Sequence, residues 1–127
     1  MKKENIKTKK TNPYKKIKAR VRITFTGDDK FFGKGVAELL HLIDEYGTIQ
    51  KACSLMDMSY TKAWRIIKRL EKELGFTIID AVSGGVSGGK SLLTDKAKDL
   101  IKRYDKLEKN VSTYATKAYK NIFYKEN

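Results

Sequence analysis

The arrangement of hydrophobic and polar residues is clearest in residues 48–74, where it predicts two helices joined by a tight corner. In the second helix, at about 100° per residue, small and aliphatic side chains share one face: Ala63, Ile67, Leu70 and Leu74. The opposite face is polar and largely basic, with Thr61, Arg65, Lys68 and Lys72. Thr48 and Ser59 precede the two helices as hydroxyl caps, and Cys53 is the small residue expected where the helices touch.

A short β segment and a further helix are predicted ahead of this pair. From Lys18 the chain alternates in the manner of a half-buried strand, with apolar positions at Val21, Ile23 and Phe25. Residues 27–29 supply a turn, and residues 30–32 pair back as a short second strand. A helix follows, with Gly47 at its left-handed end and an apolar stripe of Val36, Leu39, Leu40 and Ile43. His41 lies off this stripe, so we expect it to be exposed rather than catalytic.

The region after the third helix has the pattern of a β-hairpin. Residues 76–82 are apolar and partly β-branched, residues 83–91 form a glycine-rich loop, and residues 92–93 are apolar again. Three helices followed by a hairpin is the order of a winged helix. We therefore predict a mainly α fold with a small β component: a winged helix-turn-helix DNA-binding domain over residues 17–94, with an N-terminal strand or hairpin and a long C-terminal dimerisation helix.

Residues 95–127 are predicted to form this long helix after a cap at Thr94. Its apolar residues follow at the spacing of a coiled-coil seam: Leu100, Tyr104, Leu107, Val111, Tyr114 and Ala118. A helix of roughly 27 residues within this range would be about 40 Å long, which is more than so small a domain can cover. We expect the seam to form a homodimer; the alternative is that its first half packs within the monomer and the remainder frays.

The charge balance favours a polyanionic partner. The 127 residues include 28 Lys and Arg against 15 Asp and Glu, a formal net charge of +13. Residues 1–16 are rich in lysine and are expected to form a flexible basic arm, which either adds DNA contacts or only aids solubility. The charge makes DNA or RNA the expected partner, and the helix-turn-helix pattern favours double-stranded DNA.

Composition also narrows the cellular setting and the chemistry. No apolar run approaches the roughly 18 residues that cross a bilayer, and the N-terminus lacks the apolar stretch of a secretory signal. We therefore expect a cytoplasmic protein with no membrane partner. One cysteine and one histidine leave few ligands for a metal ion, so neither a metal site nor a cofactor is expected.

One motif suggests an enzyme. Residues 84–91, GGVSGGKS, satisfy the G-x-x-x-x-G-K-[ST] pattern of phosphate-binding loops. In such loops a helix begins at the lysine, whereas residues 91–93 are expected to be extended, and Thr94 to start the helix. The remaining sequence is also too short for the parallel sheet of such folds. We interpret the glycines as a wing whose Ser87 and Lys90 contact DNA phosphates, expect no enzyme activity, and keep nucleotide hydrolysis as a remote alternative.

The basic face of residues 59–74 supplies the expected DNA contacts. The N-terminal turns of such a recognition helix usually meet base edges; here these turns hold Ser59, Tyr60, Thr61, Lys62 and Arg65. Arg65 is the strongest candidate, since a guanidinium can form two hydrogen bonds with a guanine edge. Later residues are expected to hold phosphates: Lys68, Arg69 and Lys72. The alternative is a solvated basic face without groove contact. Trp64 is expected to anchor the core or the corner, and Cys53 to be buried without a redox role.

The sequence also resembles two families of bacterial regulators. Residues 48–71, followed by Glu73-Leu74-Gly75 and Leu93-Thr94, resemble the DNA-binding segment of LysR-type and, more closely, molybdate-responsive ModE-type regulators. The closer resemblance rests on Phe32-Gly33-x-Gly35, Ser59-Tyr60-x-Lys62-Ala63-Trp64, Gly84-Gly85 and Gly88-Gly89. It implies a winged helix-turn-helix whose long final helix dimerises and which acts on a promoter.

Two departures from the ModE-type pattern qualify this resemblance. The members that sense molybdate carry a C-terminal oxyanion-binding domain, which we expect this chain to lack, so neither molybdate sensing nor a small-molecule effector is expected within it. Asp57 stands at the corner, where many helix-turn-helix proteins have glycine.

The expected function is sequence-specific DNA binding by a dimeric transcriptional regulator, with half-sites about 34–36 Å apart. The alternative is a sequence-tolerant nucleoid or RNA-binding protein.

Overall fold

The structure, a computed structural model, describes residues 12–81 and 91–125. The chain forms two compact units: Arg22–Lys106, and a second unit that combines residues of Met1–Val21 with residues of Leu107–Asn127. Helix α5, Asp95–Phe123, supplies residues to both units.

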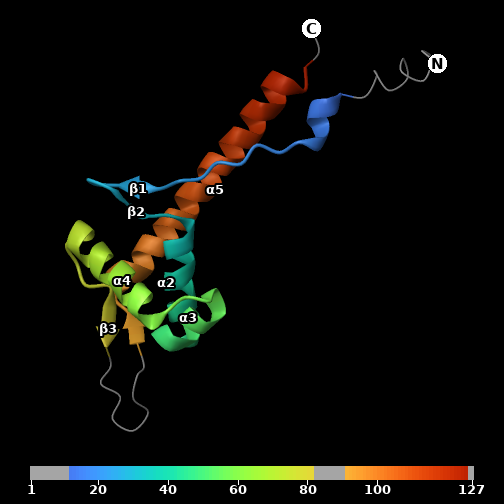
Figure 1. The fold of residues 1–127 in the computed structure, drawn as a ribbon. Helices are drawn as coiled ribbons and strands as arrows, with labels where there is room; N and C mark the ends of the chain where they lie inside the picture. The colour runs from blue at the N-terminus through green and yellow to red at the C-terminus, as the bar shows by residue number, and fades with distance from the viewer. Residues whose placement is uncertain (1–11, 82–90, 126–127) are drawn as a thin grey trace. The chain divides into compact units, whose positions relative to one another are not determined.

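The Arg22–Lys106 unit is mainly helical, as predicted, and has two small antiparallel strand pairs (Figure 1). In chain order its elements are β1 (Phe25–Thr26), β2 (Lys30–Phe32), α2 (Lys34–Tyr46), α3 (Ile49–Met56), α4 (Tyr60–Leu74), β3 (Ile79–Ala81), β4 (Ser91–Leu93) and the first part of α5. β1 pairs with β2, and β3 pairs with β4. The three helices and the following hairpin therefore occur in the predicted order.

Hydroxyl side chains cap three helices at the predicted positions. Thr48 Oγ1 accepts a hydrogen bond from the Lys51 N–H at 3.1 Å. Ser59 Oγ accepts one from the Lys62 N–H at 3.1 Å. Thr94 Oγ1 caps α5 in the same way at 3.2 Å. Each bond satisfies a backbone donor that lacks a partner inside its helix, so these local signals set where the helices begin.

The hydrophobic core of this unit is built mainly from α2, α3 and α4. Their innermost side chains are 0–2% exposed: Leu39, Leu40, Ile43, Ile49, Ala52, Ala63, Ile67 and Leu70. The β3–β4 hairpin adds Ile79 and Leu93, and α5 adds Ala97 and Ile101. The apolar faces predicted from the sequence for α2 and α4 are therefore confirmed.

The first strand is shorter than predicted. The alternation from Lys18 suggested a half-buried strand, but β1 contains only Phe25 and Thr26, and Val21 is 39% exposed. β2 has only three residues, and the register shifts between Phe25 and Thr26. The residues ahead of Phe25 therefore have no β2 residue left to pair with. The alternation instead reflects the packing of Ile23 and Phe25 against the core.

β3 and β4 form the predicted hairpin ahead of α5. Ile79 lies opposite Leu93, and both side chains are buried. Thr94 ties the base of the hairpin together, because its hydroxyl donates a hydrogen bond to the Thr77 carbonyl oxygen at 2.7 Å. The intervening residues 82–90 lie outside the described part of the chain.

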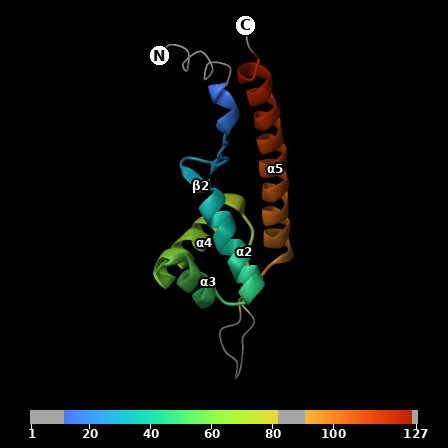
Figure 2. The same cartoon turned by 90° about the vertical axis from the view of Figure 1, so that its right-hand side faces the viewer.

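In the second unit, η1 (Pro13–Lys16) packs against the end of α5, with the Tyr14 and Phe123 ring centroids 5.0 Å apart (Figure 2). Asn12 Nδ2 donates hydrogen bonds to the carbonyl oxygens of Phe123 at 3.4 Å and Tyr124 at 3.1 Å. Residues 12–16, assigned to a flexible arm from the sequence, are thus folded here, and residues 1–11 of that arm lie outside the description.

Candidate nucleic-acid interface

Helix α4 turns opposite surfaces to the core and to solvent. Ala63, Ile67 and Leu70 are completely buried. The exposed side chains of the other face are polar or basic: Thr61, Lys62, Arg65, Lys68 and Lys72. Because residues three and four apart share one side of a helix, this arrangement forms a basic surface supported by packing beneath it. Such a surface attracts phosphate groups.

The corner between α3 and α4 depends on Asp57. Its backbone is left-handed, with φ 53° and ψ 49°, and among the described non-glycine residues only Asp57 has positive φ. This turn lets the Met58 N–H donate to the Cys53 carbonyl oxygen at 2.9 Å. Aspartate tolerates the left-handed conformation better than most residues, so the corner forms without the usual glycine.

Cys53 lies inside this corner, as predicted. It is 5% exposed, and its Sγ is 3.8 Å from the Ser59 carbonyl oxygen. Burial raises the pKa of the Cys53 thiol. Because the thiolate is the reactive form, this environment favours a packing role over a redox role.

The start of α4 exposes most of the side chains predicted to meet base edges. Ser59, Tyr60, Thr61 and Lys62 are all exposed. The Tyr60 ring meets the Trp64 ring edge-on, with 6.4 Å between centroids. Trp64 is half-buried against the core, in agreement with its predicted anchoring role. Since the Ser59 hydroxyl oxygen already accepts the cap bond, its O–H remains available as a donor.

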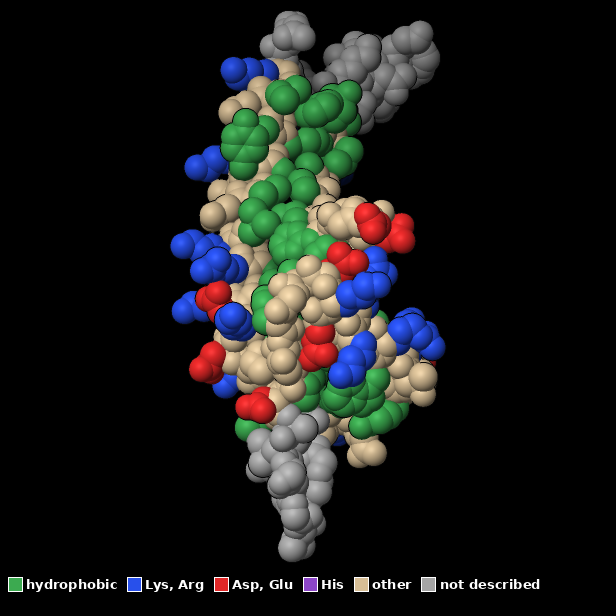
Figure 3. Space-filling view, turned by 90° about the vertical axis from the view of Figure 1, so that its left-hand side faces the viewer, with side chains coloured by type: hydrophobic (Ala, Val, Ile, Leu, Met, Phe, Trp, Pro, Cys, Tyr) green, Lys and Arg blue, Asp and Glu red, His purple; other side chains and the backbone are tan. Residues whose placement is uncertain are grey.

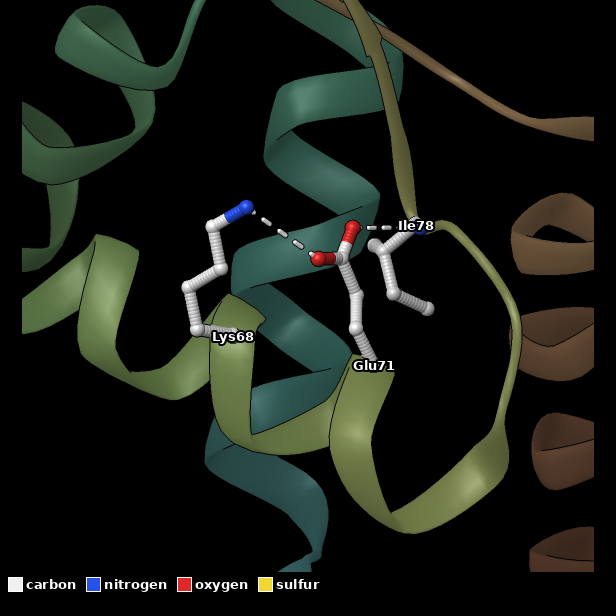
Figure 4. A network of polar contacts seen from close by, with 3 residues as sticks. All are labelled: Lys68, Glu71 and Ile78. Atoms are coloured by element: carbon white, nitrogen blue, oxygen red, sulfur yellow. Dashed lines mark hydrogen bonds and ion pairs between the residues drawn. The ribbon is translucent and has the colours of Figure 1, made fainter.

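Two acidic side chains of α4 partly neutralise its basic face. Lys68 Nζ lies 3.4 Å from Glu71 Oε1, and Arg69 Nε lies 3.2 Å from Glu73 Oε2. Glu71 Oε2 also accepts a hydrogen bond from the Ile78 N–H at 2.9 Å, which links α4 to the residue before β3 (Figure 4). Lys68 and Arg69, which the sequence predicted to hold phosphates, therefore each have an acidic partner within the helix.

The other cations of α4 have no acidic partner in the described part of the chain. Lys62, Arg65 and Lys72 are exposed and take part in none of its ion pairs. These three side chains are therefore open to an external anion. The predicted wing contacts, Ser87 and Lys90, fall within residues 82–90 and so lie outside the description.

The segment after Lys90 differs from a nucleotide-binding loop. β4 occupies Ser91–Leu93, and α5 begins only at Asp95. A phosphate-binding loop needs a helix N-terminus at its lysine, where backbone N–H groups point at the phosphates. The prediction that residues 91–93 are extended is confirmed, and the motif match lacks its structural context.

The described residues contain neither a metal-binding cluster nor a membrane-spanning helix. Within residues 12–81 and 91–125, no three His, Cys, Asp or Glu side chains form a group that could hold a metal ion. Over the same residues, every helix is too short or too polar to span a bilayer.

A cavity of about 380 Å³ adjoins α4 within the Arg22–Lys106 unit. Five basic residues line it, from the N-terminal segment, β2, α2 and α4: Arg22, Lys30, Lys34, Arg65 and Arg69. This cavity could not be predicted from the sequence, because its lining joins segments that are about 30 residues apart. The only local signal was the Phe32-Gly33-x-Gly35 motif, which also lines the cavity.

The predicted dimerisation seam is divided between the two units. Leu100 is half-buried against the core and Tyr104 is 2% exposed within it, so these two residues pack inside the Arg22–Lys106 unit. Tyr114 is 75% and Leu107 41% exposed. Val111 and Ala118 are half-buried. Figure 3 shows hydrophobic side chains gathered on one face of the second unit. The last four seam residues belong to this unit.

Comparison with characterised proteins finds several related sequences. Over 93 residues the chain is 27% identical to the molybdenum transport protein ModE of Herbaspirillum seropedicae, a match that covers 73% of this chain and 33% of that protein. Over 71 residues it is 32% identical to the transcriptional regulator ModE of Haemophilus influenzae, covering 56% of this chain and 28% of that protein. Over 84 residues it is 29% identical to the molybdenum-pterin-binding protein MopB of Rhodobacter capsulatus, covering 66% and 31% respectively.

These matches concern only a part of each relative. The chain spans 26–33% of the length of the curated relatives that it matches. No family model matches the chain.

Proposed function

The chain is a homologue of the ModE-type regulators, and from this premise we propose that it binds double-stranded DNA as a transcriptional regulator. In this proposal α2, α3, α4 and the β3–β4 hairpin form a winged helix-turn-helix, and α4 enters the major groove. The regulator acts in the cytoplasm as a homodimer.

The observation that carries the proposal is the composition of the exposed face of α4. Lys62, Arg65 and Lys72 extend from a helix whose opposite face is fully buried, and none of the three pairs with an acid among the described residues. A recognition helix needs both a rigid support and unpaired donors. The net charge of +13 adds long-range attraction to the DNA backbone.

Base recognition falls to the N-terminal half of α4. Ser59, Tyr60, Thr61, Lys62 and Arg65 meet base edges in this proposal. Arg65 is the principal reader, because its guanidinium can form two parallel hydrogen bonds with guanine O6 and N7. Such a contact is worth about 1–3 kcal/mol of discrimination between bases.

In this proposal the DNA phosphates are bound by Lys68, Arg69 and Lys72 and by the wing residues Ser87 and Lys90. Lys68 and Arg69 exchange their acidic partners for phosphates on binding. Exposed ion pairs within a helix are worth only about 0.3–0.5 kcal/mol, so a phosphate with a full negative charge can compete with Glu71 and Glu73 for these cations.

The homodimer forms through the later part of the α5 seam: Leu107, Val111, Tyr114 and Ala118. These side chains follow at spacings that place them on one side of the helix. Leu100 and Tyr104 support the seam from within each subunit rather than crossing the interface. A twofold dimer then reads two half-sites about 34–36 Å apart.

Selection of bound sites from random double-stranded DNA, with the stoichiometry of the selected complex measured by light scattering, tests this proposal. We expect an enriched, roughly palindromic sequence bound by two chains. The charge of the protein makes sequence-tolerant binding to DNA or RNA the rival function. Absence of enrichment, together with equal affinity for random DNA and RNA at physiological salt, would support that rival and contradict ours.

A further inference from the structure

The cavity beside α4 has the electrostatic character of an anion site. Arg22, Lys30, Lys34, Arg65 and Arg69 line it, and among its lining residues there is no acid. Arg69 pairs with Glu73, whereas the other four take part in none of the ion pairs of the described residues. Several like charges around one cavity repel one another, so a bound anion would relieve this repulsion.

The remaining lining, which also includes Thr24, is mostly apolar. Phe32 is buried, and Phe31, Val36 and Ile66 are half-buried side chains that pack against the core. A volume of about 380 Å³ falls within the range of about 300–1,000 Å³ that is typical of small-molecule sites, which combine apolar surfaces with a few polar groups. A simple inorganic anion would leave this apolar surface uncovered.

The first turn of α2 also lies at this cavity. Gly33, Lys34, Gly35 and Val36 all line it, and Gly33 provides no side-chain cap for the helix. The first N–H groups of a helix lack partners inside the helix and carry partial positive charge. They therefore reinforce the attraction that the basic side chains exert.

We propose that this cavity binds a small amphipathic anion, namely a carboxylate or phosphate group on an aromatic or branched aliphatic body. The basic side chains and the α2 donors hold the anionic group, and Phe31, Val36 and Ile66 cover the body. A DNA backbone phosphate is a poorer fit, because it brings no apolar body for these three side chains. The site gives the chain a ligand that its sequence did not lead us to expect.

The position of Arg65 couples this site to DNA recognition, and this step rests on the proposed function. Arg65 lines the cavity and is also the proposed guanine reader. One guanidinium cannot hold the bound anion and a guanine edge at once in the same geometry. The anion therefore acts as an effector that lowers affinity for the specific DNA site.

Calorimetric titration of the whole chain with phenyl phosphate, inorganic phosphate and phenol at constant ionic strength tests the site. We expect one phenyl phosphate per chain, bound at least about tenfold more tightly than either fragment, since a tenfold change needs only about 1.4 kcal/mol from the ring. Equal affinity for phenyl phosphate and inorganic phosphate would overturn the proposal, because only a basic surface would then be needed.

Matched variants locate the binding. Lys34→Gln removes an exposed cation that lines the cavity, and Lys98→Gln removes an exposed cation of α5 that does not. We expect Lys34→Gln to weaken phenyl phosphate several-fold and Lys98→Gln to leave it unchanged. Equal weakening by both would contradict a defined site. Amide chemical shifts should change most in residues 33–36 and 65–69, which include lining residues of the cavity. Changes centred on the basic segment 15–20, which belongs to the other unit, would contradict the proposed site.

A competition experiment separates the effector role from the DNA-binding function. Saturating phenyl phosphate should raise the Kd for the selected DNA, whereas phenol at the same concentration should not. Unchanged DNA affinity at saturation would overturn the effector role. The titration without DNA decides the site itself even if the chain proves to bind no specific DNA sequence.

Discussion

The Tyr104 hydroxyl donates a hydrogen bond to the Ile23 carbonyl oxygen at 2.8 Å. This contact joins α5 to the segment ahead of β1 across 81 residues of sequence. The Tyr104 ring also meets the Phe32 ring edge-on, with centroids 4.9 Å apart. The tyrosine that the heptad spacing assigned to a dimer seam therefore holds the interior of the Arg22–Lys106 unit together.

Tyr104→Phe should lower the free energy of unfolding by about 1 kcal/mol, because the Ile23 carbonyl oxygen loses its donor while the ring packing stays. Urea denaturation measures this change, and the slope against urea should stay constant. Tyr46→Phe is the control, since Tyr46 is 47% exposed and its change should be neutral. Equal stability of Tyr104→Phe and the wild type would show that this hydrogen bond contributes nothing net.

Replacement of Asp57 should reveal the cost of the left-handed corner. Alanine disfavours φ 53°, whereas glycine adopts such angles freely. We therefore expect Asp57→Ala to be less stable than Asp57→Gly by about 1 kcal/mol, as measured by thermal and urea unfolding. If the alanine variant were as stable as the glycine variant, the corner would have to relax to another conformation.

The thiol of Cys53 should stay unreactive as the pH rises. Its burial raises the pKa, so the folded protein binds this proton more tightly than the unfolded chain. The stability from the neutral thiol is therefore complete below the unfolded-state pKa and is lost as the pH rises through the folded-state pKa. A thiol reagent should label the native protein slowly between about pH 7 and 9 and the urea-unfolded protein quickly, since a free cysteine titrates at a pKa of about 8.5. Similar rates in both states would place Cys53 at the surface.

Arg65→Ala and Lys72→Ala should weaken DNA binding in different ways. Loss of Arg65 should cost about 1–3 kcal/mol at one base pair and flatten sequence preference. Loss of Lys72 should weaken all sequences alike and reduce the salt slope by about one. Binding to a panel of single-base variants at several salt concentrations distinguishes these effects. An unchanged preference in Arg65→Ala would remove this residue from the groove.

The helices and their caps could be predicted from sequence because their signals are local. Thr48, Ser59 and Thr94 each act on a backbone N–H only three residues ahead. Apolar periodicity likewise identified the buried faces of α2 and α4, because a single helix determines which of its residues lie together.

Several of the unpredicted features depend on long-range contacts. His41 Nε2 lies 2.8 Å from Asp105 Oδ2, and Asn12 bonds to the carbonyl oxygen of Tyr124, 112 residues away. No local pattern specifies such pairs. The apolar residues of α5 do follow a heptad spacing. Periodicity could not tell that Tyr104 packs inside the Arg22–Lys106 unit, because an apolar stripe does not identify what covers it.

The proposed dimer can be tested through Tyr114. A charge introduced there should separate the subunits, because burying an unpaired carboxylate in an apolar interface costs several kcal/mol. We expect Tyr114→Asp to be a folded monomer by sedimentation equilibrium at concentrations where the wild type is a dimer. Leu55→Asp is the matched control, since Leu55 is another exposed large hydrophobic residue, on α3, and its change should leave the dimer intact. Dissociation of both variants would indicate non-specific hydrophobic association, and persistence of the Tyr114→Asp dimer would place the interface elsewhere.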